Sequence, residues 1–331
     1  MKMRRRLFGL SMGRTLRFVR QAGIAGWALA LSAGCDASFN PKGPYNDQLA
    51  LYSVLTTRSD SQFVRVFSTY NPTGHNPLEN TVDTYVRNAK VTLSRDSVVT
   101  TLTSVVIPRT DKSRYKDDLV GYVAFPYTLQ PGRTYTLKVT SDKGNAEATI
   151  TVPARGEVYA NNPYIMKHPE KYDEDLSSRI RLSPAAQGYL VRIKLEFETK
   201  LGSLVTRHQE EIPSAVFTAD GSSFRFDYPI LTRRNVSPYV TYEAVYFGLN
   251  AYKAFLVDVK SRYGAITVTG ATYILTQVDR VLYTYYNLAN GFQDAFSIRT
   301  DLPDYTNIRG GLGVFGSMVE DSVYVDLRAV E

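Results

Sequence analysis

Residues 189–198 carry the most regular pattern of apolar and charged side chains in the chain. Apolar side chains take every second position and ionised ones the positions between them: Val191, Arg192, Ile193, Lys194, Leu195, Glu196, Phe197 and Glu198. A period of two is that of a β-strand, whose successive side chains point to opposite faces. The pattern therefore predicts a strand with one buried face and one ionic face.

Shorter segments rich in Val, Leu, Phe, Tyr and Thr recur elsewhere, separated by Gly, Pro, Asp and Asn, as in strands joined by turns. They predict strands over residues 48–57, 62–70, 89–94, 98–107, 119–127, 134–140, 146–152, 204–211, 223–231, 240–247, 252–260, 265–276 and 322–329. One helix is predicted near residues 277–289, where Val278, Leu282 and Tyr285 recur at helical spacing. A further strand is the alternative for that segment.

Composition divides the 331 residues into five parts. Residues 1–34 form a signal, and residues 35–47, rich in Asn, Pro, Gly and Ser, form a tether. Residues 48–153 and 177–331 are two β-rich regions of ordinary domain size, joined by a linker over residues 154–176. We therefore expect a mostly β fold, with a first antiparallel sandwich followed by a second sandwich-like domain that contains one short helix.

The first 34 residues have the three parts of a secretory signal. A basic head without acids precedes an apolar stretch over residues 22–33, which ends in the small residues Ser32, Ala33 and Gly34 before Cys35. The stretch is shorter than the roughly 20 apolar residues that span a bilayer. Met1 and Met12 both remain candidate starts.

Ser32-Ala33-Gly34-Cys35 resembles a lipobox, the motif that the lipoprotein signal peptidase cuts before a lipid-modified cysteine. Cys35 is the only cysteine of the chain, whereas exported proteins usually hold an even number or none. The resemblance implies cleavage between Gly34 and Cys35 and anchoring in membrane lipid through acylated Cys35. The alternative is an ordinary signal whose cleavage falls near a cysteine.

Removal of the signal changes the charge of the protein. Seven of the 39 Lys and Arg lie in residues 1–34, so the remaining 32 balance the 32 Asp and Glu. A formally neutral chain does not favour binding to nucleic acid, which needs a basic face.

The sequence contains no pattern typical of a catalytic or metal site. His75, His168 and His208 have no partner at ligand spacing, and the acidic run Asp173-Glu174-Asp175 lacks the spacing of a calcium loop. We therefore expect no metal, no cofactor and no enzymatic activity.

The glycines of Gly311-Leu-Gly313-Val-Phe-Gly316 have the spacing of a dinucleotide-binding loop, but too few residues follow for the required helix and strand. We expect these glycines to permit turns or close backbone approach.

Tyrosine is abundant, with 24 residues, and most of them fit the preference of tyrosine for strands. Tyr283, Tyr285 and Tyr286 lie closer together than the rest and form a candidate ligand surface for a glycan.

Two segments of the chain resemble known protein families. The segment from Leu129 to Val139, with its Pro131-Gly132 turn, resembles a phrase of immunoglobulin-like and carboxypeptidase-regulatory-like domains. The stretch Asn307-Ile-Arg-Gly-Gly-Leu-Gly-Val-Phe-Gly316 resembles the ending of a family of uncharacterised envelope lipoproteins, mostly from Bacteroidota, whose "Ala-x-Val-x-Leu" strand is matched by Ala89-Lys-Val-Thr-Leu93. The family resemblance implies an envelope lipoprotein, often encoded beside a TonB-dependent outer-membrane receptor.

These observations lead to one main hypothesis and two alternatives. The main one is a non-enzymatic, lipid-anchored accessory or binding component at the outer membrane, working with a receptor or transporter. The alternatives are a structural or adhesive protein that binds glycan or peptidoglycan, and a hydrolase whose site no motif marks.

Overall fold

The computed structural model describes residues 44–71, 76, 79–219, 223–235, 237, 241–289 and 305–330. Residues 47–331 form one compact unit. Gly34 and Cys35 lie outside the described residues, so signal cleavage and lipidation stay predictions. The division at the linker over residues 154–176 also stays a prediction.

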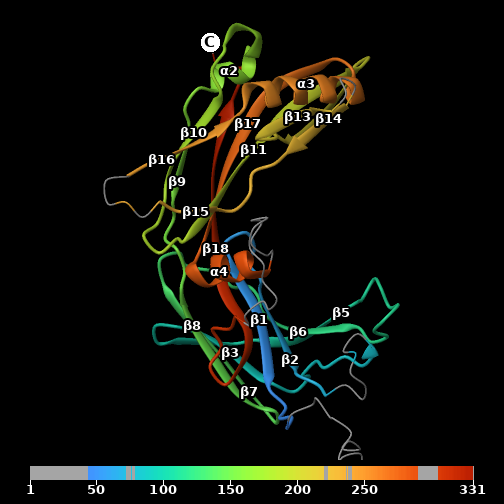
Figure 1. The fold of residues 1–331 in the computed structure, drawn as a ribbon, viewed down its shortest axis with the longest axis vertical. Helices are drawn as coiled ribbons and strands as arrows, with labels where there is room; N and C mark the ends of the chain where they lie inside the picture. The colour runs from blue at the N-terminus through green and yellow to red at the C-terminus, as the bar shows by residue number, and fades with distance from the viewer. Residues whose placement is uncertain are drawn as a thin grey trace, which may run out of the picture. The chain divides into compact units, whose positions relative to one another are not determined.

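The first strand-rich region folds as two sheets packed face to face (Figure 1). Its strands are β1 (Leu49–Thr56), β2 (Gln62–Ser68), β3 (Lys90–Arg95), β4 (Val98–Thr101), β5 (Thr103–Ile107), β6 (Leu119–Ala124), β7 (Thr134–Ser141) and β8 (Gly144–Thr151). β1, β2, β6 and β5 are successive neighbours in one sheet, and the other has the order β4-β3-β7-β8. The strand predicted over residues 98–107 is therefore two strands, because the chain changes sheets at the buried Leu102.

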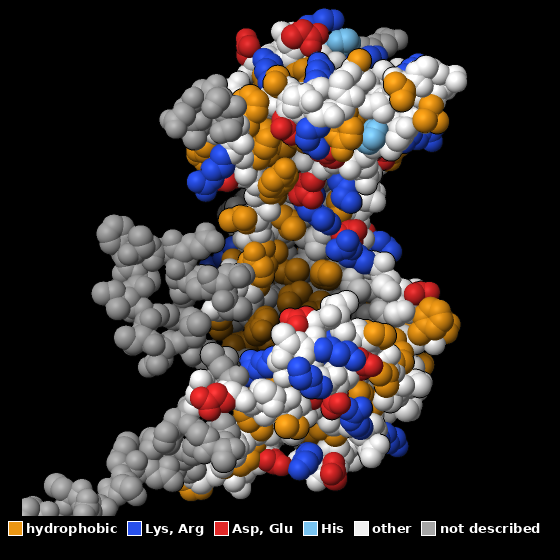
Figure 2. Space-filling view, turned by 90° about the vertical axis from the view of Figure 1, so that its right-hand side faces the viewer, with side chains coloured by type: hydrophobic (Ala, Val, Ile, Leu, Met, Phe, Trp, Pro, Cys, Tyr) orange, Lys and Arg blue, Asp and Glu red, His pale blue; other side chains and the backbone are white. Residues whose placement is uncertain are grey.

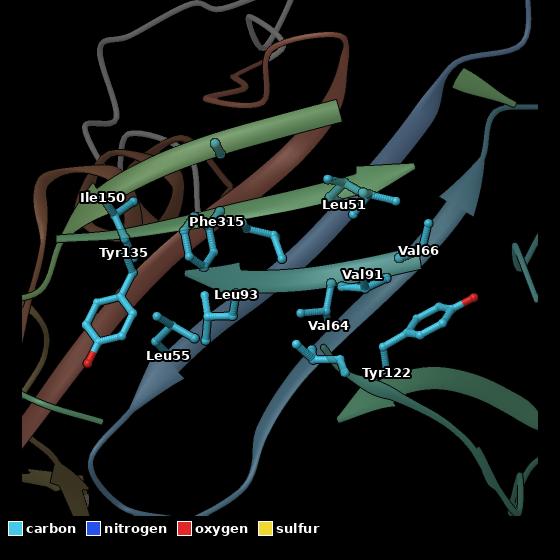
Figure 3. Packing of buried hydrophobic residues seen from close by; sticks show 14 of the residues in the cluster. Leu51, Leu55, Val64, Val66, Val91, Leu93, Tyr122, Tyr135, Ile150 and Phe315 are labelled. Carbon is cyan, nitrogen blue, oxygen red and sulfur yellow. The ribbon is translucent and has the colours of Figure 1, made fainter. Parts of the chain in front are cut away.

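A first apolar core fills the space between these two sheets (Figure 3). Leu51 of β1 and Val64 of β2 meet Leu93 of β3 and Tyr135 of β7, and each is almost fully buried. Burial of a side chain of this size contributes about 1.5 to 3 kcal/mol. The alternation along each strand places one face in this core, as the sequence pattern predicts.

The second region contains a longer sheet and several smaller pieces. Its elements are β9 (Glu157–Ala160), α2 (Pro163–Lys167), the 3-10 helix η2 (Pro169–Lys171), β10 (Leu176–Arg181), β11 (Gly188–Leu201), β12 (Leu204–Glu211), β13 (Ala215–Ala219), β14 (Ser223–Asp227), β15 (Thr232–Arg233), β16 (Glu243–Phe247), α3 (Leu249–Tyr263), β17 (Ile266–Val278), α4 (Arg280–Ala289) and β18 (Gly311–Asp326). The described strands form the series β12-β11-β17-β18, which continues through β1 into the sheet of the first region, the small sheet β16-β10-β9 and the hairpin β13-β14. The mostly β, sandwich-like fold class is thereby confirmed, with short helical segments inside the expected linker.

A second apolar core lies against one face of β11. Ile193, Leu195 and Phe197 are fully buried there with residues of β9, β10 and α3, while the charged residues between them stay partly exposed. The strand predicted over residues 189–198 is confirmed as the centre of β11.

The strand predicted over residues 252–260 is wrong, because these residues belong to the helix α3. Tyr252, Phe255, Leu256 and Val259 are buried at helical spacing, and all four join the second core. The helix begins after Gly248 and ends at Gly264, whose φ of 77° suits a glycine. The fold therefore has more than the one short helix expected.

The helix predicted near residues 277–289 is confirmed, but it begins later. Gln277 and Val278 end strand β17, and α4 starts at Arg280. Gln277 is fully buried. Its side chain accepts a hydrogen bond from the Ser183 amide (2.7 Å) and donates one to the Ala154 carbonyl (3.2 Å).

The last strand, β18, pairs on both sides along different halves of its length. Residues 311–318 pair in parallel with β1, and residues 318–326 pair antiparallel with β17. Figure 1 shows β18, in red, beside β1, in blue, so the first and last described strands are neighbours. Only residues 322–329 were predicted as a strand at this end, because three glycines weaken the strand signal before them.

Candidate functional surfaces

The glycine-rich ending is part of the sheet and has a structural role. A Cβ atom on Gly313 would lie 2.0 Å from the Leu51 carbonyl oxygen, and the φ of Gly313 is 104°. The Asn307 side chain donates to the Phe315 carbonyl (2.8 Å) and accepts from the Phe315 amide (3.0 Å). These glycines let β18 approach β1 closely, as expected. A dinucleotide-binding loop would be followed by a helix, whereas these residues continue as strand β18.

The three tyrosines of the candidate ligand surface lie on α4 but have different surroundings. The ring of Tyr283 covers the backbone of Gly188, where an added Cβ would lie 2.3 Å from it. Tyr285 and Tyr286 are exposed. Tyr283 therefore packs against a strand, and a role of this surface in binding stays a prediction.

Asp279 begins α4 from a buried position. Its carboxylate accepts hydrogen bonds from the Leu282 amide and from the Ser317 hydroxyl, both at 2.7 Å. These bonds favour the ionised form, but burial dominates and raises the pKa of Asp279 to about 6. The group is an N-cap, since it satisfies a free amide of the first helical turn.

No cluster of three or more His, Cys, Asp or Glu able to hold a metal is present among the described residues. The imidazole of His168 lies 3.5 Å from Glu170, and that of His208 hydrogen-bonds to the Thr199 hydroxyl at 2.9 Å and stacks on Phe197. His75 lies outside the described residues. Nor, in the part of the chain that the structure describes, is any helix both long and apolar enough to cross a bilayer.

Lys and Arg side chains are interspersed with Asp and Glu on the face that Figure 2 shows. This arrangement agrees with the balance of 32 basic and 32 acidic residues after residue 34. The expectation that the chain does not bind nucleic acid stays a prediction.

An aromatic and basic cluster lies on the outer face of the small sheet β16-β10-β9. It consists of Tyr159, Arg179, Tyr242 and Tyr246, here called the Tyr–Arg surface. The Arg179 guanidinium lies 5.4 Å from the ring centre of Tyr159 and 4.8 Å from that of Tyr242. The two rings meet edge to face with their centres 6.1 Å apart. Tyr246 is the most exposed of the three tyrosines, at 64%.

The sheet register produces this cluster. Arg179 is paired with Tyr159 of β9 on one side and with Ala244 of β16 on the other, so their side chains share one face. The opposite face carries Leu176, Ile180 and Val158, which belong to the second core.

Arg179 differs from its neighbour Arg181 in its charge balance. Arg181 forms an ion pair with Glu157, which also accepts a hydrogen bond from the Tyr159 hydroxyl. Among the described residues, Arg179 has the two rings as partners and no carboxylate within ion-pair distance. In the part of the chain that the structure describes, its guanidinium therefore lies against two rings and has no carboxylate to balance its charge.

The sequence reasoning missed this surface. Tyr159 lies in the segment assigned to the linker, and Arg179 lies in a segment for which no strand was predicted. Tyr242 is more than 60 residues away from Arg179 along the chain. A period-two pattern over Leu176, Ser178 and Ile180 could have indicated β10 and an outward Arg179.

These features define a mostly β protein with two apolar cores, a sheet of nine described strands in which β18 joins strands of both regions, and an exposed aromatic and basic surface. The chain belongs to the family described as Domain of unknown function (DUF4249), which matches residues 36–323. A comparison with curated proteins found no match.

Proposed function

We propose that this protein is a non-enzymatic, lipid-anchored lipoprotein of the cell envelope, held at the outer membrane as an accessory or binding component of a receptor or transporter. The anchor is acylated Cys35, and a TonB-dependent receptor is the proposed partner. The observation that carries the proposal is the position of the only cysteine directly after Ser32-Ala33-Gly34, at the end of an apolar stretch with a basic head.

The lipid anchor has a clear energetic basis. Each buried methylene of an acyl chain contributes about 0.8 kcal/mol, and one chain alone gives only marginal binding. A lipoprotein cysteine carries more than one chain, and together these chains hold the protein firmly. The tether over residues 35–47 then separates the lipid from β1.

The Tyr–Arg surface is the proposed contact with the protein partner. Tyrosine and arginine are enriched among the residues that dominate binding energy in protein interfaces. Arg179 contacts two rings in the free protein, and such contacts reduce the side-chain entropy that is lost when it binds. A carboxylate of the partner would complete its charge balance.

Metabolic labelling with a palmitate analogue tests the anchor. The wild-type protein should take up the label and fractionate with outer membranes, and Cys35→Ala should lose the label and remain uncleaved. Ser38→Ala, a small change in the tether, should keep both. An unlabelled wild-type protein, or label retained in Cys35→Ala, contradicts the proposal.

Cross-linking in native membranes, followed by affinity purification, tests the contact. Wild type should recover an outer-membrane receptor, and Arg179→Ala and Tyr242→Ala should each reduce the yield at least about tenfold, as loss of a central interface residue does. Arg87→Ala, an arginine with a half-exposed side chain elsewhere, is the control. Equal recovery in all variants excludes the Tyr–Arg surface as the contact.

A further inference from the structure

The ionic face of the second sheet contains a cavity of about 240 Å³ that none of the features above uses. Its polar walls come from Glu196 and Glu198 of β11, Arg207 and Gln209 of β12, Tyr324 of β18, and Arg328. Sites for drug-sized ligands usually hold about 300 to 1,000 Å³, so this cavity suits a single small ring.

A β-bulge shapes the cavity. Glu196 pairs with Gly270 of β17 and Phe197 pairs with Val268, so Thr269 is the extra residue of the bulge, and its hydroxyl donates to the Glu196 carbonyl (3.2 Å). The carbonyl of Thr269 accepts a hydrogen bond from the Leu327 amide (3.0 Å), which draws the turn after β18 toward the sheet. Arg328 thereby reaches the cavity, and bulges commonly reposition side chains in this way.

Tyr324 forms a flat aromatic wall. A Cβ atom on Gly270 would lie 2.3 Å from the Tyr324 hydroxyl oxygen and 2.7 Å from two ring carbons. The ring therefore lies directly on the backbone of Gly270, in a place that only a glycine leaves open. Tyr324 is 49% exposed, and its ring lines the cavity.

The polar groups around the ring are already held in position. Glu196 accepts a hydrogen bond from the Gln209 amide (3.1 Å), and Glu198 accepts one from Arg207 (3.2 Å). Arg328 binds Asp326 through two hydrogen bonds of 2.9 and 3.0 Å. Each carboxylate of the cavity keeps a second oxygen, and each guanidinium keeps further N–H groups, without a hydrogen bond among the described residues.

The charges that line the cavity point to a neutral ligand. Glu196 and Glu198 carry two negative charges and Arg207 and Arg328 carry two positive ones, while Asp326, which Arg328 binds, adds one more negative charge beside the cavity. An anion would meet the two carboxylates and a cation would meet the two guanidiniums. A neutral ring with several hydroxyl groups can donate to the first pair, accept from the second and place its apolar face on Tyr324.

We infer that this cavity binds a neutral pyranose unit of a saccharide, stacked on Tyr324 and hydrogen-bonded to Glu196 and Glu198 as acceptors and to Arg207 and Arg328 as donors. The inference goes beyond the proposed function and does not depend on it, since the cavity and the Tyr–Arg surface share no residue.

Saturation-transfer NMR on the full-length protein, in a detergent without a sugar headgroup, tests the inference. The probes are the methyl glycosides of glucose, galactose, mannose and N-acetylglucosamine, with methyl glucuronide as the anionic counterpart. At least one neutral glycoside should bind in the millimolar range, and methyl glucuronide should bind several times more weakly than methyl glucoside or than the neutral glycoside that binds best. No binding of any of the four neutral glycosides overturns the inference.

Three variants locate the binding. Tyr324→Ala should abolish the signal, and Tyr324→Phe should retain it because the ring remains. Tyr228→Ala removes a tyrosine of matching exposure, 48%, away from the cavity and should leave binding unchanged. A signal that persists in Tyr324→Ala, or that is lost in Tyr285→Ala instead, assigns the sugar to another place and overturns the inference. Should Tyr324→Ala fail to fold, Glu196→Gln must weaken binding severalfold for the inference to stand.

Discussion

The two halves of β18 use opposite kinds of residue for the same backbone conformation. The first half, beside β1, is rich in glycine and apolar residues and ends near the buried Ser317. The second half, beside β17, carries Glu320, Asp321 and Tyr324 on partly exposed positions. One half is selected for close backbone approach and the other for an ionic face.

The difference shows that one strand can meet two packing requirements, one in each half of its length. In the first half, β1 and α4 lie so near that side chains must be absent, as at Gly313 and Gly316. In the second half, Glu320 accepts hydrogen bonds from Arg192 and Thr276, both at 3.2 Å, and lies 3.5 Å from Arg58. Substitutions in the two halves should therefore cause losses of stability that differ in magnitude and in physical cause.

The largest effect is expected at Gly313. Gly313→Ala places a methyl group against the Leu51 carbonyl, 2.0 Å away, in a backbone conformation that disfavours a side chain. We expect a loss of at least about 4 kcal/mol in the free energy of unfolding, measured with urea. Gly202→Ala, at a φ of 63° with open space around it, should cost only about 1 kcal/mol. Equal losses would show that close approach does not matter in the first half.

An intermediate, pH-dependent effect is expected at the junction of the halves, where Ser317 meets Asp279. The folded pKa of Asp279, about 6, lies above its ordinary value of 3.8, so folding favours the protonated form. The stability from this group is fully present below about pH 4 and is lost as the pH rises through about 6, by up to about 3 kcal/mol.

Asp279→Asn removes this titration and keeps an oxygen for the helix cap. The free energy of unfolding of the variant minus that of wild type should therefore be more favourable at pH 8 than at pH 4.5. Urea unfolding of both proteins at both pH values measures this difference. Asp326→Asn is the control, and its stability relative to wild type should change with pH in the opposite direction. Hydrogen bonds from Arg328 lower the pKa of Asp326, so this carboxylate stabilises the folded protein at high pH and not at low pH. A stability difference between Asp279→Asn and wild type that stays constant with pH would contradict the buried, titrating carboxyl.

The smallest effect is expected at Glu320 in the second half. Glu320→Ala leaves Arg192, only 20% exposed, with Glu211 at 3.9 Å as its remaining carboxylate partner. Because the site is partly open to water, the loss should be about 1 to 2 kcal/mol by thermal or urea unfolding. Glu320→Gln keeps the bond from Thr276 and should lose less. A loss equal to that at Gly313 would remove the contrast between the halves.

The strands of this fold could largely be predicted from the sequence, since period-two alternation is local. Val91 and Leu93, or Ile193 and Leu195, face a core because every second residue does so. The helix α3 was missed although Tyr252, Phe255, Leu256 and Val259 have helical spacing and glycines flank the segment. Its β-branched and aromatic residues outweighed the periodicity.

The candidate surfaces could not be predicted, because they depend on pairings between distant segments. Arg179 and Tyr242 meet through the register of β10 and β16, and Tyr324 meets Gly270 through that of β18 and β17. The tyrosines chosen from sequence proximity, Tyr283, Tyr285 and Tyr286, share a helix whose faces point in different directions. Nearness along the chain was thus a poor guide to a common surface.

The parallel pairing of β18 with β1 also determines when the first sheet can be completed. A ribosome makes β1 first, and residues 311–318 emerge only after nearly all of the remaining chain. Until then β1 offers an unpaired edge to other strands, and contacts of such long sequence separation form slowly. A chain truncated before Gly311 should therefore aggregate, so complete synthesis must precede native folding.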